Sequence, residues 1–142
     1  MIFGKRERRI SRILIVEDEP LVAFDNETML IDAGYEVVAT VDSFADAAAA
    51  IDAHEIDLVL TDLNLSGEGD GTDVARAAAA KDIPVLFVTG NCADAAQGPA
   101  LGCLTKPYTE RVLLNALRAV DEHLQGQDVT KLPGELVLYV RA

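Results

Sequence analysis

The sequence predicts an α/β protein built on a doubly wound sheet of five parallel strands. Five short runs rich in Val, Ile and Leu alternate along the chain with segments of helical pattern. The runs are apolar throughout, as is typical of strands that are buried on both faces. Each connection suits a crossover between parallel neighbours. We therefore expect helices on both faces of the sheet.

The expected strands are recognised by the polar residues at which their apolar runs stop. The first run stops at Glu17-Asp18-Glu19, and the third stops at Asp62. The fourth stops at Thr89-Gly90, and the fifth at Lys106-Pro107. The strands are expected at residues 10–16, 36–41, 57–61, 84–88 and 102–105.

Local signals indicate where the helices begin and end. Pro20 suits the first position of a helix, and Gly34 suits the left-handed stop after one. Ser43 with Asp46 resembles a capping box, and Thr109 is placed to cap the last helix. The helices are expected at residues 20–33, 44–54, 72–81 and 110–124.

The segment between the fourth and fifth strands is short. Only residues 90–101 separate Thr89 from Gly102, and Gly98-Pro99 interrupts them. A crossover with its helix needs at least about 10–12 residues. The fourth helix is therefore expected to be shortened or irregular, drawn from residues 92–97, and marginal by itself.

The length of 142 residues suits one domain. We expect that domain over residues 1–125, followed by a C-terminal extension over residues 126–142. Residues 126–134 have the composition of a linker, and residues 135–140 that of a strand. A terminal apolar strand would expose an edge unless it pairs, so it should join a sheet edge of this chain or of a partner.

Composition excludes several classes of function. The formal net charge is −12, from 24 acidic and 12 basic residues, which argues against nucleic-acid binding. The charge favours a divalent cation or a basic partner, or serves solubility alone. The sequence contains no apolar run of the roughly 18 residues that a membrane span needs. Cys92 and Cys103 resemble neither a disulfide framework nor a zinc site, so the chain is expected to be a cytoplasmic protein in a reducing environment.

Five polar residues at four strand ends form the candidate site: Glu17, Asp18, Asp62, Thr89 and Lys106. In open parallel sheets, ligands bind beyond the carboxyl ends of the strands. Crowded carboxylates repel unless a cation offsets them, and hard oxygen ligands of this kind select Mg²⁺. A carboxylate can also act as the nucleophile toward phosphorus. Asp18 and Asp62 suit direct metal contacts and Glu17 a contact through water, while Lys106 and Thr89 suit the phosphoryl oxygens.

These residues resemble the response-regulator receiver family. The resemblance rests on four pieces in order, namely Ile-Leu-Ile-Val-Glu-Asp-Glu (13–19), Asp-Leu-Val-Leu-Thr-Asp-Leu-Asn-Leu (57–65), Thr89-Gly90 and Lys106-Pro107-Tyr108, within residues 10–124. It implies a flavodoxin-like sheet of order 2-1-3-4-5 and Mg²⁺-dependent phosphorylation of Asp62 by a sensor histidine kinase. It also implies a metal contact from the carbonyl of Asn64 and a cis peptide bond before Pro107.

A closer likeness is to the branch of that family named for its Phe-Ala-Thr-Gly-hydrophobic-Tyr signature. The chain reads Phe-Val-Thr-Gly-Asn-Cys over residues 87–92, which matches at Phe, Thr and Gly and departs at the other three positions. Cys103 stands where many receivers have an aromatic switch residue. Without a rotating ring, we expect phosphorylation to order residues 90–100 instead.

The sequence leaves two other functions open. An aspartate-nucleophile phosphohydrolase also has an Asp at a strand end, but it typically has a second Asp two residues later, where this chain has Asn64. A pseudo-receiver would bind partners without phosphorylation, although all five chemical positions are filled here.

We therefore predict a single-domain response regulator that signals through protein–protein contacts and is no enzyme beyond its own phosphoryl transfer and dephosphorylation. The expected partners are a sensor histidine kinase and a histidine phosphotransfer or other downstream protein, with no nucleic acid and no membrane. A stand-alone regulator, a phosphoryl shuttle and a sink that drains a kinase all fit the sequence.

Overall fold

The computed structural model describes residues 9–92, 99–129 and 131–139. Its strands are β1 Arg12–Val16, β2 Glu36–Val41, β3 Leu58–Thr61, β4 Val85–Thr89, β5 Gly102–Thr105 and β6 Leu136–Leu138. Its helices are α1 Pro20–Asp32, α2 Phe44–Ala53, α3 Gly71–Ala79 and α4 Glu110–Leu124. The five predicted parallel strands and the four longer predicted helices are thus present, with ends that coincide with the expected ones or differ by one or two residues.

The strands form one sheet of order β2-β1-β3-β4-β5-β6. The first five strands pair in parallel in the predicted order. The sixth runs antiparallel to β5, with Leu138 opposite Gly102 and Leu136 opposite Leu104. The prediction of a strand in the C-terminal extension is therefore confirmed, and it joins an edge of its own sheet. The five-stranded parallel sheet becomes a six-stranded mixed one, because an apolar tail strand stabilises an otherwise open edge.

Gly102 makes the pairing of β6 with β5 possible. A Cβ built on Gly102 would lie 2.4 Å from the carbonyl oxygen of Val137, closer than real Cβ atoms approach. Thr105 and Tyr139 also donate their backbone N–H groups to Glu135 and Leu101 across this edge. The close approach of β6 to β5 thus depends on the missing side chain.

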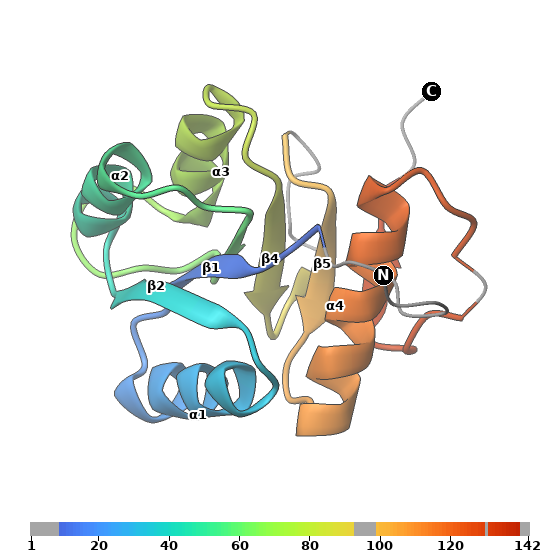
Figure 1. Ribbon diagram of the computed structural model, residues 1–142. Helices are drawn as coiled ribbons and strands as arrows, with labels where there is room; N and C mark the ends of the chain where they lie inside the picture. Colours follow the sequence, from blue (N-terminus) through green and yellow to red (C-terminus); the bar gives the residue numbers. More distant parts are fainter. Residues whose placement is uncertain (1–8, 93–98, 130, 140–142) are drawn as a thin grey trace.

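The helices cover the sheet on both faces, as Figure 1 shows. Alternate residues of each strand point to opposite sides, so β1 sends Ile13 and Ile15 into one cluster and Leu14 and Val16 into the other. The first cluster packs against α1 and α4, and the second packs against α2 and α3. Two apolar layers therefore hold the strand ends in fixed positions.

Capping interactions fix the helix boundaries that the sequence signals predict. Ser43 accepts a hydrogen bond from the backbone of Asp46, and Thr109 accepts one from that of Val112. Gly34 has a φ of 95°, in the left-handed region. Asp70 forms a full capping box with Asp73, which begins α3 at Gly71, one residue earlier than expected.

The predicted short helix over residues 92–97 lies, apart from Cys92, outside the described residues. It stays a prediction, as does the ordering of residues 90–100. Among the described parts of the chain, no helix is both long and apolar enough to cross a membrane.

Candidate functional site

The predicted site residues meet at the carboxyl ends of four adjacent strands. Glu17 and Asp18 directly follow β1, and Asp62 directly follows β3. The backbone N–H of Asp62 donates to the carbonyl of Val16 at 3.0 Å, which extends the β1–β3 pairing to the site. On the other side, Lys106 donates its backbone N–H to the carbonyl of Thr89 at 2.9 Å. The sheet thus places the side chains through its own hydrogen bonds.

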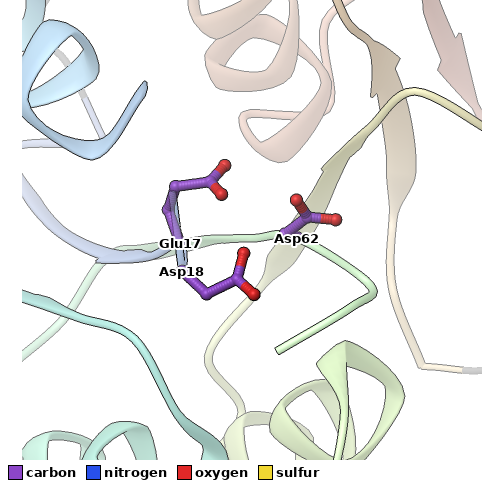
Figure 2. A group of neighbouring side chains, drawn as sticks. All are labelled: Glu17, Asp18 and Asp62. Atoms are coloured by element: carbon purple, nitrogen blue, oxygen red, sulfur yellow. The ribbon is translucent and has the colours of Figure 1, made fainter. Parts of the chain in front are cut away.

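Three carboxylates gather at the centre of the site. Oxygen atoms of Glu17, Asp18 and Asp62 all lie within 4.8 Å of one another. Glu17 and Asp62 are buried and Asp18 is half-buried, and Figure 2 shows the three side chains around a common space. Carboxylate oxygens are the hard ligands that Mg²⁺ prefers, and one or two of them with retained waters suffice for it. The donor set therefore fits the predicted metal.

Lys106 supplies the positive charge of the site. Its ammonium donates to Glu17 Oε1 at 2.5 Å and to Asp62 Oδ2 at 2.8 Å, from a side chain that is 17% exposed. Burial acts to lower the pKa of Lys106, but the hydrogen bonds to Asp62 and Glu17 and their charges outweigh burial and raise it. Lys106 therefore stays charged and joins two of the three carboxylates.

Glu17 has a pKa above its usual 4.5, because burial disfavours the charged form. Hydrogen bonds from Lys106 and from the backbone N–H of Glu19 act in the opposite direction, while the charge of Asp62 adds to the increase. The carboxylates are thus only partly compensated by protein groups. A bound cation would relieve that remaining repulsion.

Two predicted residues lie at the border of this cluster. Asn64 is exposed and donates its backbone N–H to Asp62 Oδ1 at 3.3 Å, so its predicted metal contact through the carbonyl stays a prediction. Thr89 is buried at the end of β4, and its hydroxyl accepts the N–H of Asn91 at 3.5 Å, a long hydrogen bond.

The structure adds a positioning residue that the sequence analysis did not single out. A Cβ on Gly71 would lie 2.1 Å from the carbonyl oxygen of Asp62, and Gly71 donates its backbone N–H to Leu63. The first turn of α3 therefore packs directly on the backbone that carries Asp62. The sequence signal that could have identified Gly71 is its position at the end of the glycine-rich loop over residues 66–71.

The turn that carries Lys106 is held from two sides. The Lys106–Pro107 peptide bond is cis, as predicted. The next residue, Tyr108, donates its hydroxyl to Asn26 of α1 at 2.9 Å. Burial raises the pKa of Tyr108 to about 12, so the hydroxyl remains a donor. No local sequence pattern indicates this contact between distant segments.

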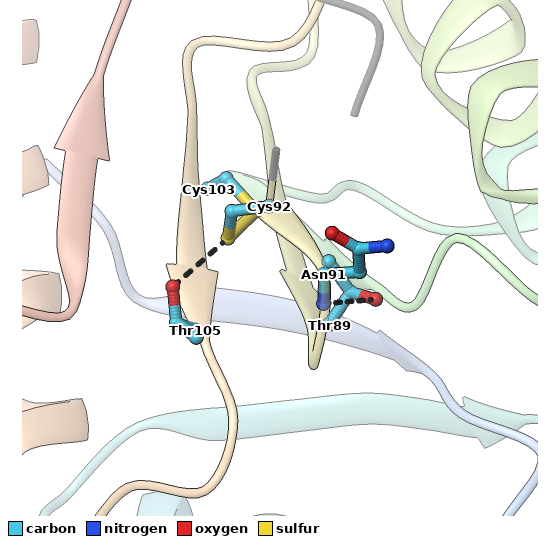
Figure 3. Close-up of a disulfide and its surroundings, with 5 residues drawn as sticks. All are labelled: Thr89, Asn91, Cys92, Cys103 and Thr105. Carbon is cyan, nitrogen blue, oxygen red and sulfur yellow. Dashed lines mark hydrogen bonds between the residues drawn. A yellow bond between two sulfur atoms is a disulfide. The ribbon is translucent and has the colours of Figure 1, made fainter. Parts of the chain in front are cut away.

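The prediction that the two cysteines do not serve as a disulfide is wrong, because Cys92 and Cys103 form one. Cys103 lies on β5 opposite Phe87 of β4, and the chain after Thr89 turns back so that Cys92 reaches it. Figure 3 shows the disulfide beside Thr89 and Thr105. Sequence spacing did not reveal the pair, since only the pairing of β4 with β5 brings the two residues together.

The fold and the acidic cluster define a parallel α/β signalling domain with a carboxylate site at its strand ends. Residues 13–118 match the response regulator receiver domain family. The chain therefore belongs to the receiver domain family of two-component signalling, as the sequence motifs predicted. Its assignment to the branch with the Phe-Ala-Thr-Gly signature stays a prediction.

Relatives and solved structures agree with this assignment. The chemotaxis protein CheY of Pseudomonas aeruginosa is 31% identical over 81% of this chain and 99% of its own length. The solution structure of SdrG from Sphingomonas melonis Fr1 has a TM-score of 0.65 and 38% identity over 79% of this chain and 97% of that chain. The receiver domain of the sensor histidine kinase PA1611 from Pseudomonas aeruginosa, solved with magnesium in its active-site cleft, has a TM-score of 0.65. It is 27% identical over 76% of this chain and 94% of that chain.

Other relatives are longer than the matched region. The chain spans 62% and 51% of the lengths of two mycobacterial regulatory proteins, PdtaR and RegX3, that it also matches. The functions of those whole proteins are therefore not assigned to this chain, which shares only part of their length.

Proposed function

We propose that this chain is a single-domain response regulator that accepts a phosphoryl group on Asp62 from a histidine kinase in a Mg²⁺-dependent reaction. The observation that carries the proposal is the contact of Lys106 with Asp62 at 2.8 Å, beside the carboxylates of Glu17 and Asp18. Three acids and one lysine at the ends of parallel strands suit phosphoryl transfer better than a structural role. Membership of the receiver family adds support.

Asp62 is the nucleophile in this proposal. One of its carboxylate oxygens forms the bond to phosphorus, while the bond from phosphorus to the histidine nitrogen of the kinase breaks and its electron pair stays on the imidazole. Lys106 holds Asp62 Oδ2 before the reaction and is placed to pair with a phosphoryl oxygen afterwards. Thr89 contributes a hydroxyl donor at the neighbouring strand end.

Asp18 and Asp62 would hold Mg²⁺ directly, Glu17 through water, and Asn64 through its carbonyl. When bound, Mg²⁺ neutralises negative charge on the phosphoryl oxygens. The magnesium ion in the PA1611 receiver cleft supports this part of the proposal. An open pocket is lined by two of the three carboxylates, Glu17 and Asp18, and also by Asp42 and Asp46.

The output of the phosphorylated protein is proposed to be contact with another protein, a downstream regulator or a histidine phosphotransfer protein. A cytoplasmic location follows from a kinase partner that uses ATP. The protein is proposed to catalyse nothing beyond its own phosphorylation and dephosphorylation.

Acetyl phosphate with Mg²⁺ tests the assignment. Wild type should gain the mass of one phosphoryl group on Asp62, and Asp62→Ala should gain none. Asp42→Ala is the matched control, since Asp42 lines the pocket beside Glu17 and Asp18 but lies outside the carboxylate cluster. It should label as wild type does. Full labelling of Asp62→Ala would refute the acceptor assignment.

The same samples separate the alternatives. Repeated turnover of a generic phosphomonoester would favour a phosphohydrolase. Neither labelling nor binding of Mg²⁺ in wild type would favour a pseudo-receiver.

A further inference from the structure

The disulfide between Cys92 and Cys103 lies beside the proposed phosphoryl site, and the proposed function makes no use of it. Their Cα atoms are 5.9 Å apart, within the range for disulfides. Cys103 is completely buried in the middle of β5. Cys92 is half-buried and follows Thr89 by only three residues. The bond therefore ties the segment after Thr89 to the core of the sheet.

The surroundings of the disulfide connect it to both phosphoryl-contact residues. Thr105, which directly precedes Lys106, donates its hydroxyl to the sulfur of Cys92 at 3.2 Å. Asn91, which directly precedes Cys92, donates its N–H to the hydroxyl of Thr89. Figure 3 shows these two hydrogen bonds on either side of the sulfur atoms. A change at Cys92 would thus reach the hydroxyl that Thr89 offers to the phosphoryl group.

We propose that the Cys92–Cys103 disulfide is a reducible modification site and that its reductant is a protein or small-molecule dithiol. The redox state of this site controls how far residues 90–92, beside Thr89, can move. The proposal rests on the proposed function for its consequence, a change in phosphoryl acceptance. It adds a second input, cellular redox state, to a site that otherwise responds to a kinase.

Reduction would be local, because the sheet does not depend on the disulfide. β4 and β5 pair at four positions, from Leu86 with Gly102 to Thr89 with Thr105. Cys103 remains enclosed by its apolar cluster whether or not its sulfur is bonded. The segment leading to Cys92 begins at Gly90. A Cβ on Gly90 would meet nothing within 4 Å, so Gly90 has room to change conformation.

The two sulfur atoms differ in access, which sets the direction of exchange. A thiolate of the dithiol attacks the sulfur of the half-buried Cys92 and forms a mixed disulfide with it, and the thiolate of Cys103 leaves and takes up a proton. The second thiolate of the dithiol then attacks the dithiol sulfur that is bonded to Cys92. The thiolate of Cys92 leaves and is protonated in turn. Two electrons pass to the protein, and the dithiol becomes a disulfide. In a reducing cytosol, disulfides are usually transient and redox-sensing.

The oxidised form keeps Asn91 in place, with its N–H donating to the hydroxyl oxygen of Thr89 at 3.5 Å, and this contact restricts the rotation of the Thr89 side chain. The reduced form releases Cys92, so that residues 90–92 can move and the Thr89 hydroxyl, which keeps its own hydrogen as a donor, can rotate toward a phosphoryl oxygen. We expect the reduced protein to accept phosphoryl groups about fivefold faster, which is the effect on a rate of one more hydrogen bond of typical strength in the transition state.

The test compares wild type oxidised in air with wild type reduced by dithiothreitol. Alkylation and mass spectrometry count the free thiols in each sample, and acetyl phosphate with Mg²⁺ measures the rate of labelling at Asp62. Cys92→Ser cannot form the bond and leaves the buried Cys103 in place, so it should label at the reduced rate under both conditions. Cys103→Ala is a second variant with the same expectation, in case one of the two folds poorly.

Equal labelling rates for the two redox forms of wild type would overturn the proposal, and so would two free thiols in the air-oxidised sample. Absence of labelling in both forms would instead contradict the proposed function. Hydrogen exchange at the amides of Asn91 and Cys92, measured without any phosphoryl donor, then decides the redox proposal. Faster exchange on reduction supports release of the segment, and unchanged exchange overturns it.

Discussion

The carboxyl end of the sheet has two halves that are held in different ways. The acidic half lies at the ends of β1 and β3 and consists of Glu17, Asp18 and Asp62. Backbone pairing of the strands holds these residues in position, and the ammonium of Lys106 neutralises part of their charge. The edge half comprises the ends of β4 and β5 with the disulfide and β6. A covalent bond and an added antiparallel strand restrain it.

In the proposed function, this difference would separate the phosphoryl chemistry of the domain from its redox control. The acidic half consists of charged groups whose arrangement follows from strand order, as phosphoryl transfer requires. The edge half consists of apolar, covalent and backbone interactions that can be altered without moving a carboxylate. Lys106 is the link, since its side chain contacts the acidic half while its backbone pairs with Thr89.

The largest expected effect comes from removing this link with Lys106→Met. Glu17 and Asp62 would then lie buried without their cation, and breaking a buried pair costs about 3–5 kcal/mol. We expect a loss near the lower value in urea unfolding with a chelator present, and partial recovery with Mg²⁺. Lys81→Met is the control, because Lys81 pairs with Asp52 at the surface and should lose at most about 1 kcal/mol. Equal losses would contradict the distinction.

The pH dependence of Lys106→Met gives a sharper form of this prediction. The pKa of Glu17 is raised in the folded state, so the folded protein binds more protons than the unfolded one in the range above 4.5. Stability from this group therefore falls as pH rises through that range. Without Lys106 the pKa of Glu17 rises further. The stability deficit of Lys106→Met should thus be larger at about pH 7 than at about pH 5.

The next effect concerns the backbone that supports the acidic half. Gly71→Ala places a methyl group against the carbonyl oxygen of Asp62, which the fixed strand end cannot avoid. We expect a loss of about 1–3 kcal/mol in the free energy of unfolding and slower labelling of Asp62. Gly134→Ala is the control, since a Cβ there meets nothing within 4 Å. Unchanged labelling of Asp62 in Gly71→Ala would show that α3 does not position Asp62.

A smaller effect is expected at the corresponding glycine of the edge half. Gly102→Ala directs a methyl group at Val137, but β6 has three residues near the end of the chain and can move away. We expect about 1 kcal/mol of destabilisation. Hydrogen exchange at the amides of Thr105 and Tyr139, which pair across this edge, should become faster, with labelling of Asp62 little changed. Slow exchange at both amides would contradict this.

The last substitution has an effect of similar size, but it should increase the free energy of unfolding and not decrease it. The hydroxyl of Tyr139 is buried and has no hydrogen-bond partner among the residues that the structure describes. Tyr139→Phe should therefore raise the free energy of unfolding by about 1 kcal/mol. Tyr108→Phe removes a hydroxyl that donates to Asn26 and should lower it by about 1 kcal/mol. Shifts in the same direction would show that the hydroxyl of Tyr139 is bonded in solution.

The fold was predictable because its signals are local. A buried parallel strand is an unbroken apolar run, and it stops where its end reaches the polar edge, as at Val16 before Glu17 and Thr61 before Asp62. Helix caps such as Ser43 and Thr109 act within one turn of their own helices. Each of these signals is contained in a few consecutive residues.

Other contacts were not predictable because they join residues far apart in the sequence. Buried Asp121 accepts the backbone N–H of Arg9, 112 positions away, and thereby fixes the first described residues to α4. Tyr108 bonds Asn26 across 82 positions. An isolated Asp or Tyr has no neighbouring residue that announces such a partner.

By itself, the sequence determined the family through the motifs at its strand ends, and the resemblance to that family implied the order of the five parallel strands. The sequence also determined the five residues of the candidate site, because parallel pairing brings these strand ends to one edge. Only the tertiary structure decided what surrounds them. The disulfide depends on the register that places Cys103 opposite Phe87, where a returning segment can reach it. The place of β6 depends on a free strand edge and on the space that Gly102 leaves. Register and close packing are relations between distant segments, and no single segment of the sequence contains them.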